Sequence, residues 1–88
     1  MGIVVLHFFA GWCQPCNILE TKFQELKVTY PNIEFRKITI EKDNDLFQEY
    51  TIRKIPTVII MNNETKEIIA RIDGFNLPLL LEELSKLT

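Results

Sequence analysis

The sequence predicts an α/β protein in which a four-stranded mixed sheet carries helices on both faces. An apolar run near the start, a segment with helical spacing and a second β-forming run make a strand–helix–strand unit, whose strands are expected to be parallel with a right-handed crossover. Further on, a short polar loop joins two β-forming runs, which makes them antiparallel. The full order is β-α-β-α-β-β-α. A chain of 88 residues is expected to form one domain, residues 1–88.

The first expected strand covers residues 3–9, where β-branched and aromatic side chains occur without a clean polar alternation. This pattern favours a central strand that is covered on both faces. His7 therefore points into a covered layer. Two interpretations of His7 are open at this point: a buried neutral histidine with a satisfied hydrogen bond, or a catalytic group.

The second expected element is a helix from Cys13 to about Tyr30. Its apolar residues recur at helical spacing and form one face: Cys16, Leu19, Phe23, Leu26 and Tyr30. The polar residues between them are expected to face water: Asn17, Glu20, Gln24 and Lys27. Cys16 thus begins the buried face, and Cys13 lies one turn earlier, at the mouth of the helix.

Two further elements follow this helix. Residues 33–40 mix charged residues with β-formers, which predicts a strand near an edge of the sheet. Residues 43–50 have apolar side chains at helical spacing and predict a short helix, with Asp45 in the capping position because Gln48 follows three residues later. The acidic residues of this segment are interpreted as helix-start residues rather than catalysts.

The chain ends with a predicted hairpin and a predicted helix. Residues 57–61 and 67–72 are two strands joined by the polar loop 62–66. Asn76 is the expected N-cap of the last helix. The buried face of this helix is expected to consist of leucines: Leu77, Leu80, Leu81, Leu84 and Leu87.

Composition limits the classes of function. The net charge of -2, the pI near 5.3 and the absence of a Lys/Arg run argue against a nucleic-acid binder. The apolar start lacks the basic residues of a signal peptide, and Leu6 stands where N-myristoylation requires Ser or Thr. We therefore expect no membrane association, and interpret the chain as a cytoplasmic protein, or as a processed or excised domain, that is monomeric.

The only two cysteines, Cys13 and Cys16, allow a single intramolecular disulfide. A structural zinc site takes four ligands, and only His7 could supplement the two thiols, so we expect no metal and no cofactor.

Two cysteines at this spacing at a helix start are close enough to bridge. Unpaired backbone N–H groups and the positive end of the helix dipole favour a Cys13 thiolate. Pro15 costs little in the first turn, where its missing N–H would lack an intrahelical partner.

These features predict thiol-disulfide exchange. Cys13, expected to be the exposed nucleophile, attacks a substrate disulfide and forms a mixed disulfide. Cys16, expected to be buried one turn away, then attacks Cys13 and releases the reduced product. A Cys-x-x-Cys sequence also occurs in zinc knuckles and iron-sulfur sites, but a strand before it and a helix after it favour the redox function.

At this point the sequence resembles the thioredoxin family, over essentially its whole length. Residues 8–16 (Phe-Phe-Ala-Gly-Trp-Cys-Gln-Pro-Cys) are similar to the active-site block, Ile55-Pro56-Thr57 to the cis-proline loop and Gly74 to the glycine beside the site. The resemblance implies the thioredoxin fold. It also implies that Pro56 is cis and packs against the thiols, whereas X-Pro bonds in general are cis in only about 5–6% of cases.

The resemblance further implies how a substrate binds. The backbone of Ile55 would pair with an extended substrate segment as an added strand, and Trp12 would cover the site. Gln14 replaces the usual glycine, which implies a shifted redox potential, and Thr21 stands where a helix-kinking proline is common. The leading strand and helix of a typical member are missing, so the architecture is expected to be the smaller, glutaredoxin-like one.

His7 is the most consequential departure from the family pattern. It occupies the position of the buried aspartate that handles the proton of the resolving cysteine, and Lys37 matches the lysine that accompanies it. If the two residues are close, burial and like charge disfavour a cationic His7, and the neutral imidazole is a base for Cys16. The alternatives are that His7 is a core residue and that Lys37 is a solvated side chain on an edge strand.

The predicted function is a dithiol reductase of protein disulfides, recharged by a flavoprotein thioredoxin reductase. Chain length alone suggests an alternative, a glutathione-coupled glutaredoxin-like enzyme. Against it, the Gly-Gly-acidic signature is absent near Asp73-Gly74 and the cysteine loop lacks the Cys-Pro-Tyr-Cys order. A third hypothesis is a binding module whose dithiol gates a protein partner.

Overall fold

The computed structural model describes residues 2–87, and the order of its elements is the predicted one. The elements are β1 (Ile3–Phe9), α1 (Gln14–Thr29), β2 (Ile33–Thr39), α2 (Asn44–Glu49), β3 (Thr57–Asn62), β4 (Ile68–Asp73) and α3 (Leu77–Ser85). The predicted α/β class is therefore confirmed.

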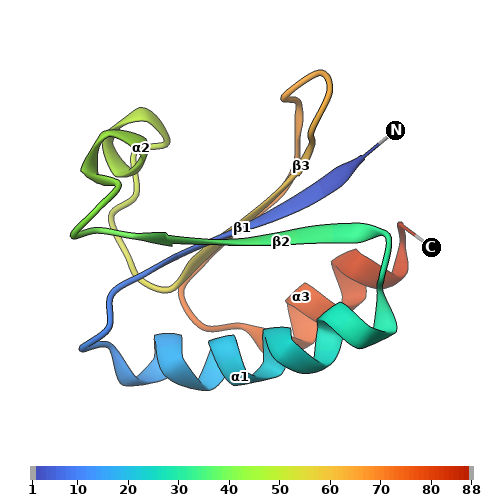
Figure 1. Ribbon diagram of the computed structural model, residues 1–88, viewed down its shortest axis with the longest axis horizontal. Helices are drawn as coiled ribbons and strands as arrows, with labels where there is room; N and C mark the ends of the chain where they lie inside the picture. Colours follow the sequence, from blue (N-terminus) through green and yellow to red (C-terminus); the bar gives the residue numbers. More distant parts are fainter. Residues whose placement is uncertain (1, 88) are drawn as a thin grey trace.

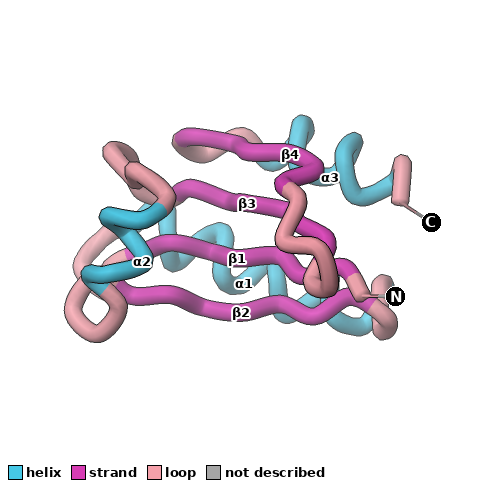
Figure 2. Tube along the Cα trace, turned by 90° about the horizontal axis from the view of Figure 1, so that it is seen from above, coloured by secondary structure: helices cyan, strands magenta, loops and turns pink. Residues whose placement is uncertain are grey.

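The four strands form one mixed sheet in the order β2-β1-β3-β4 (Figure 2). β1 pairs parallel with β2 and antiparallel with β3, and β3 pairs antiparallel with β4. The charged strand β2 lies at an edge, as predicted, and its register places Lys37 opposite His7 of β1. The apolar strands β1 and β3 take the two central positions, which agrees with their burial on both faces.

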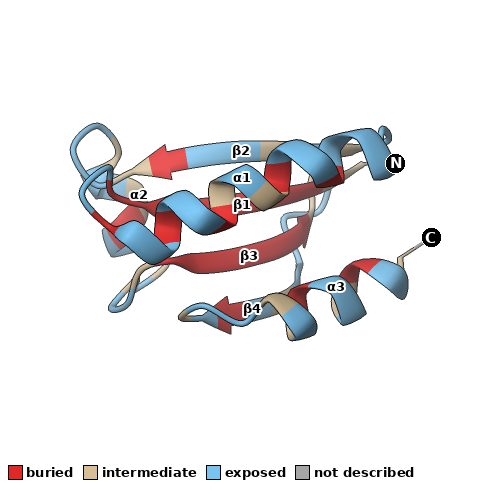
Figure 3. Ribbon diagram, turned by 90° about the horizontal axis from the view of Figure 1, so that it is seen from below, coloured by how far each residue is buried: buried red, intermediate tan, exposed pale blue. Residues whose placement is uncertain are grey.

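Helices cover both faces of the sheet, as predicted: α1 and α3 lie on one side and α2 on the other (Figure 1). The core under α1 and α3 includes Val5, Phe23 and Leu80, and the core under α2 includes Phe8 and Phe47. Seen from below, the buried residues of α1 and α3 lie on the helix sides that face the sheet (Figure 3). Because side chains alternate along β1, they pack into two separate cores, one on each face of the sheet.

Two local predictions are wrong. The short helix α2 begins at Asn44 with Asp43 at its N-cap, so Asp45 lies inside the first turn and is not the cap. In α3, Leu81 is 39% exposed, because Leu80 is fully buried and neighbouring residues of a helix point about 100° apart. The predicted cap of α3 is confirmed, since the Asn76 side chain accepts a hydrogen bond from the Leu79 amide over 3.2 Å.

None of the helices within residues 2–87 has the length and apolar character that a membrane span requires.

Candidate active site

The two cysteines form a disulfide at the start of α1. Cys13 is the N-cap residue, and the Cα atoms of Cys13 and Cys16 are 5.2 Å apart. The Cys16 backbone N–H donates to the Cys13 sulfur over 3.3 Å, so Sγ of Cys13 accepts one of the unpaired amides of the first turn. Pro15 stands in that first turn, where it was expected. After reduction, the same amide and the positive end of the helix dipole would favour a thiolate on Cys13.

The burial of Cys16 agrees with the expectation, whereas that of Cys13 does not. Cys16 is fully buried, as expected, but Cys13 is also buried, with only 7% of its surface exposed. The disulfide packs in a small cluster with Phe9 and Ala10, and Ile55 lies against this cluster. Cys13 is therefore the more accessible residue of a buried pair rather than an exposed nucleophile.

A cis peptide bond between Ile55 and Pro56 places the loop before β3 next to the disulfide. This isomer was implied by the family resemblance, and it is confirmed. Pro56 is buried, and its carbonyl oxygen accepts a hydrogen bond from the Gly74 amide over 2.8 Å. Gly74 has φ +86°, a left-handed conformation that glycine adopts without steric cost. The two loops beside the disulfide are thus fixed to each other.

Trp12 is the exposed aromatic residue next to Cys13. Its side chain is 74% exposed, and it lines an open hollow of about 320 Å³ on the outer side of α1 together with Gln14 and Ile18. The residues that bury the disulfide are those of the cluster described above, with Ile55 from the cis-proline loop. Trp12, Ile18 and Phe75 are all large apolar side chains with at least 45% of their surface exposed.

His7 is buried in the layer between the sheet and α1, with 1% of its surface exposed. Its Nδ1 lies 3.1 Å from Oε1 of Glu20, and its ring stacks on Phe9 and contacts Phe23. Burial lowers the pKa of His7 below 6.5 and outweighs the opposing effect of Glu20, and Lys37 adds the smallest lowering. The predicted preference for neutral imidazole is therefore supported, mainly by desolvation, and at neutral pH the contact with Glu20 is a hydrogen bond rather than an ion pair.

Glu20 is the residue of this layer that the sequence interpretation missed. It was expected to face water, but its side chain is only 17% exposed, and it accepts from Gln24 Nε2 over 3.0 Å. Lys37, whose side chain is 56% exposed, brings its Nζ to 3.9 Å from Glu20 Oε2. Lys37 is thus largely solvated and at the same time within ion-pair distance of Glu20. The sequence does contain a sign that Glu20 is partly buried. Residues four apart on a helix share a face, and Glu20 follows the buried Cys16 by four.

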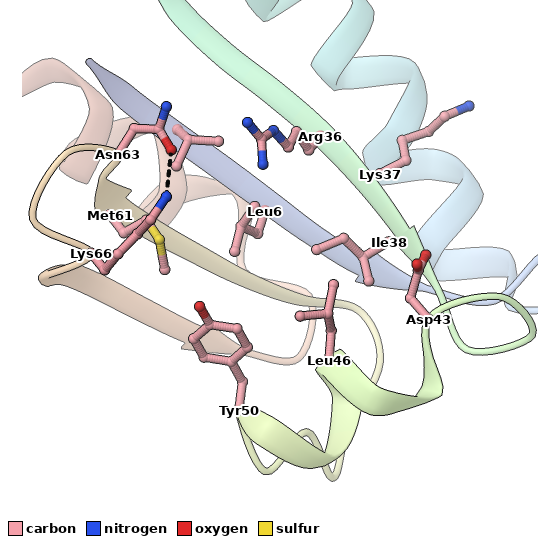
Figure 4. Close-up of a pocket in the computed structure, with 11 residues that line it drawn as sticks. Leu6, Arg36, Lys37, Ile38, Asp43, Leu46, Tyr50, Met61, Asn63 and Lys66 are labelled. Atoms are coloured by element: carbon pink, nitrogen blue, oxygen red, sulfur yellow. Dashed lines mark hydrogen bonds between the residues drawn. The ribbon is translucent and has the colours of Figure 1, made fainter. Parts of the chain in front are cut away.

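A separate hollow of about 490 Å³ lies on the other face of the sheet, between α2 and the β3–β4 loop (Figure 4). Lys66 donates to Asn63 over 3.1 Å at its margin. Neither cysteine lines this hollow, and Val4 and Met61, which do, are at most 3% exposed. Its apolar floor is therefore part of the core under α2.

Within residues 2–87, no group of three or more His, Cys, Asp or Glu side chains is arranged to hold a metal ion.

Comparison with known proteins agrees with this geometry. The family model described as Thioredoxin matches residues 1–83. Thioredoxin 2 of Plasmodium falciparum is 34% identical over 74 residues, which are 83% of this chain and 46% of that protein. Thioredoxin H5 of rice, Oryza sativa subsp. japonica, is 37% identical over 84 residues, which are 96% of this chain and 61% of that protein.

A solved thioredoxin structure from Fasciola hepatica superimposes with a TM-score of 0.88 at 26% identity, and the match covers 97% of this chain and 80% of the solved one. The chain spans about half the length of the first curated relatives, 46% and 44%. The family model nonetheless covers nearly all of it, including both cysteines and the cis-proline loop. The chain therefore belongs to the thioredoxin family.

Proposed function

We propose that this protein is a thiol-disulfide oxidoreductase that reduces protein disulfides through Cys13 and Cys16. The observation that carries the proposal is the disulfide at the N-terminus of α1, where a backbone amide donates to the Cys13 sulfur beside the cis Ile55-Pro56 bond. Family membership supports it. We also propose that residues 1–88 act as one catalytic domain.

The reaction consists of two exchange steps. The Cys13 thiolate attacks one sulfur of the substrate disulfide, the substrate S–S bond breaks, and the departing sulfur takes up a proton from water. The Cys16 thiolate then attacks Cys13, breaks the mixed disulfide and releases the second substrate thiol. The substrate gains two electrons and the protein becomes the disulfide seen in the structure. The slightly greater exposure of Cys13 supports its role as the attacking residue.

Substrate binding is assigned to the two loops beside the disulfide. The backbone of Ile55 pairs with an extended substrate segment, and Pro56 and Gly74 keep that backbone in place through their hydrogen bond. Trp12 offers an exposed aromatic surface to the substrate next to Cys13, and Gln14 in the cysteine loop tunes the redox potential.

His7 is assigned the role of base for the Cys16 thiol, and Lys37 supports it by its positive charge and by its contact with Glu20. Two facts support this: the neutral imidazole that burial favours, and the shared layer between α1 and the sheet. The cellular electron source is proposed to be a flavoprotein thioredoxin reductase, with the protein acting as a cytoplasmic monomer.

A coupled assay tests the proposal. Reduction of insulin disulfides is measured with NADPH and thioredoxin reductase, and separately with glutathione and glutathione reductase. Turnover is expected with the first system and is abolished in Cys13→Ser. Turnover with glutathione alone would favour the glutaredoxin-like alternative. Loss of turnover in both systems, with partner binding retained when both cysteines are replaced, would favour the redox-gated binding module.

A further inference from the structure

The hydrogen bond between His7 and Glu20 determines which imidazole nitrogen holds the proton. Nδ1 of His7 lies 3.1 Å from Oε1 of Glu20. Gln24 Nε2 donates to the same carboxylate over 3.0 Å, and Lys37 Nζ lies 3.9 Å from it. An ionised carboxylate can only accept hydrogen bonds. The hydrogen of a neutral His7 must therefore sit on Nδ1.

The other nitrogen of His7 is left with a lone pair and no partner. Nε2 is buried, and no donor or acceptor within residues 2–87 reaches it. Buried polar atoms in native proteins are nearly always hydrogen-bonded, so an exception calls for an explanation. A basic atom that is kept free for a proton that arrives during the reaction is such an explanation.

The unpartnered nitrogen lies in the layer that contains the resolving cysteine. Phe9 stacks on the His7 ring with centroids 5.1 Å apart, and it also packs in the cluster with Cys16. From the helix side, Glu20 lies one turn after Cys16 on α1. His7, Glu20 and Cys16 therefore belong to the same layer between β1 and α1, and Phe9 connects the imidazole to the cluster that contains Cys16.

We propose that Glu20 is a positioning residue: its carboxylate holds His7 as the Nδ1–H tautomer, so that Nε2 is free to take the thiol proton of Cys16. The inference rests on the proposed exchange function. In the resolving step the Cys16 S–H proton moves to Nε2, Cys16 attacks Cys13, and the bond from Cys13 to the substrate sulfur breaks. The departing sulfur takes a proton from water, and His7 returns its proton to water.

The charged groups around His7 fit this role. Glu20 faces it from α1 and Lys37 from β2, and with Lys27 and Arg36 they line a cavity of about 10 Å³ beside the imidazole. A cavity of that size is at the lower limit for one water molecule. Glu20 stabilises the transient imidazolium through the existing hydrogen bond and, being 17% exposed, connects it to solvent.

The tautomer can be measured directly, because His7 is the only histidine of the chain. Long-range ¹H–¹⁵N NMR spectra of ¹⁵N-histidine-labelled protein distinguish a protonated Nδ1 from a protonated Nε2. We expect the Nδ1–H form in the reduced and the oxidised wild-type protein. In Glu20→Met, which removes the acceptor, we expect a mixture of tautomers. Glu20→Gln keeps an oxygen acceptor and should retain the wild-type tautomer.

The resolving step can be followed separately with Ellman's reagent, which releases one thionitrobenzoate when Cys13 attacks and a second when Cys16 resolves the mixed disulfide. In Glu20→Met the second release is expected to slow by about tenfold, a small part of what general bases contribute, while the first is unchanged. Glu20→Gln should partly restore it. Glu25→Gln is the matched control, an exposed glutamate of the same helix, and should change neither release.

An Nε2–H tautomer in the wild-type protein would overturn the inference, and this result needs no variant that might fail to fold. An unchanged second release in a folded Glu20→Met would also overturn it. If the tautomer is as expected but insulin is not reduced, the proposed function fails and the geometry stands. If insulin is reduced by a protein with the Nε2–H form, only the role of Glu20 fails.

Discussion

The Gly74 amide donates to the carbonyl oxygen of Pro56 over 2.8 Å and so joins the turn after β4 to the start of β3. Both residues lie at the ends of paired strands, since Thr57 is opposite Asp73 in the register. The position of the cis-proline loop beside the disulfide is therefore set by the sheet itself, through one hydrogen bond and one left-handed glycine.

Gly74→Ala should destabilise the protein because alanine is unfavourable at this backbone conformation, and not because the added methyl group would clash. A Cβ atom added at Gly74 would meet nothing within 4 Å, but its φ of +86° is unfavourable for alanine. We expect a loss of about 1 kcal/mol in the free energy of unfolding, measured by urea denaturation. Gly11→Ala is the control, because a Cβ there also meets nothing and Gly11 has no positive φ. Equal losses in both variants would contradict this explanation.

Arg71→Met should loosen the segment that leads to the cis-proline. The Arg71 guanidinium donates to the carbonyl oxygens of Tyr50 and Thr51 at the end of α2 and contacts Asp73. Because the side chain is partly exposed, we expect a loss of only about 1–2 kcal/mol in the free energy of unfolding. Amide hydrogen exchange of residues 50–56 should become faster. Arg53→Met, at an exposed position, should leave that exchange unchanged.

The free energy of unfolding should decrease as the pH is lowered, over a range that is set by His7. Its pKa is lowered in the folded state, so below pH 6.5 the unfolded chain binds a proton that the folded chain does not. The contribution of neutral His7 is complete above its unfolded pKa and is lost as the pH falls below it, by at most about 1.4 kcal/mol per pH unit. His7→Asn should flatten the unfolding free energy between pH 6.5 and 5. An unchanged slope in that variant would show that other groups cause it.

Cys16→Ser should trap the reaction at its midpoint. Without the resolving thiol, the bond between Cys13 and the substrate sulfur persists, because Cys16 is the residue that breaks it in the proposed mechanism. We expect a stable covalent adduct with a disulfide-containing protein, detected by mass spectrometry and released by dithiothreitol. Cys13→Ser is the comparison, since the fully buried Cys16 should form little adduct.

Much of the fold follows from local sequence patterns. The apolar strands, the helical spacing from Cys16 to Leu26 and the cap at Asn76 each have a local physical cause, and the structure has all of them. The cis state of Pro56 could come only from the family resemblance, because base rates favour trans. The prediction that Glu20 faces water rested on its polarity alone. Its burial instead depends on its position on the helix and on its contact with His7, thirteen residues earlier.

The two edges of the sheet differ in how they meet other chains. On β2, Glu34 and Arg36 pair on one face while Lys37 extends toward Glu20 on the other, so a strand added there would disturb charged contacts on both faces. Such charges are a common protection of edge strands. On β4 the charged pair Arg71 and Asp73 lies toward the end of the strand, whereas Ile68 and Ile69 at its start are 46% and 41% exposed. At high concentration, self-association of this protein is therefore expected to begin at β4, and a lysine in place of Ile69 is the change that would suppress it.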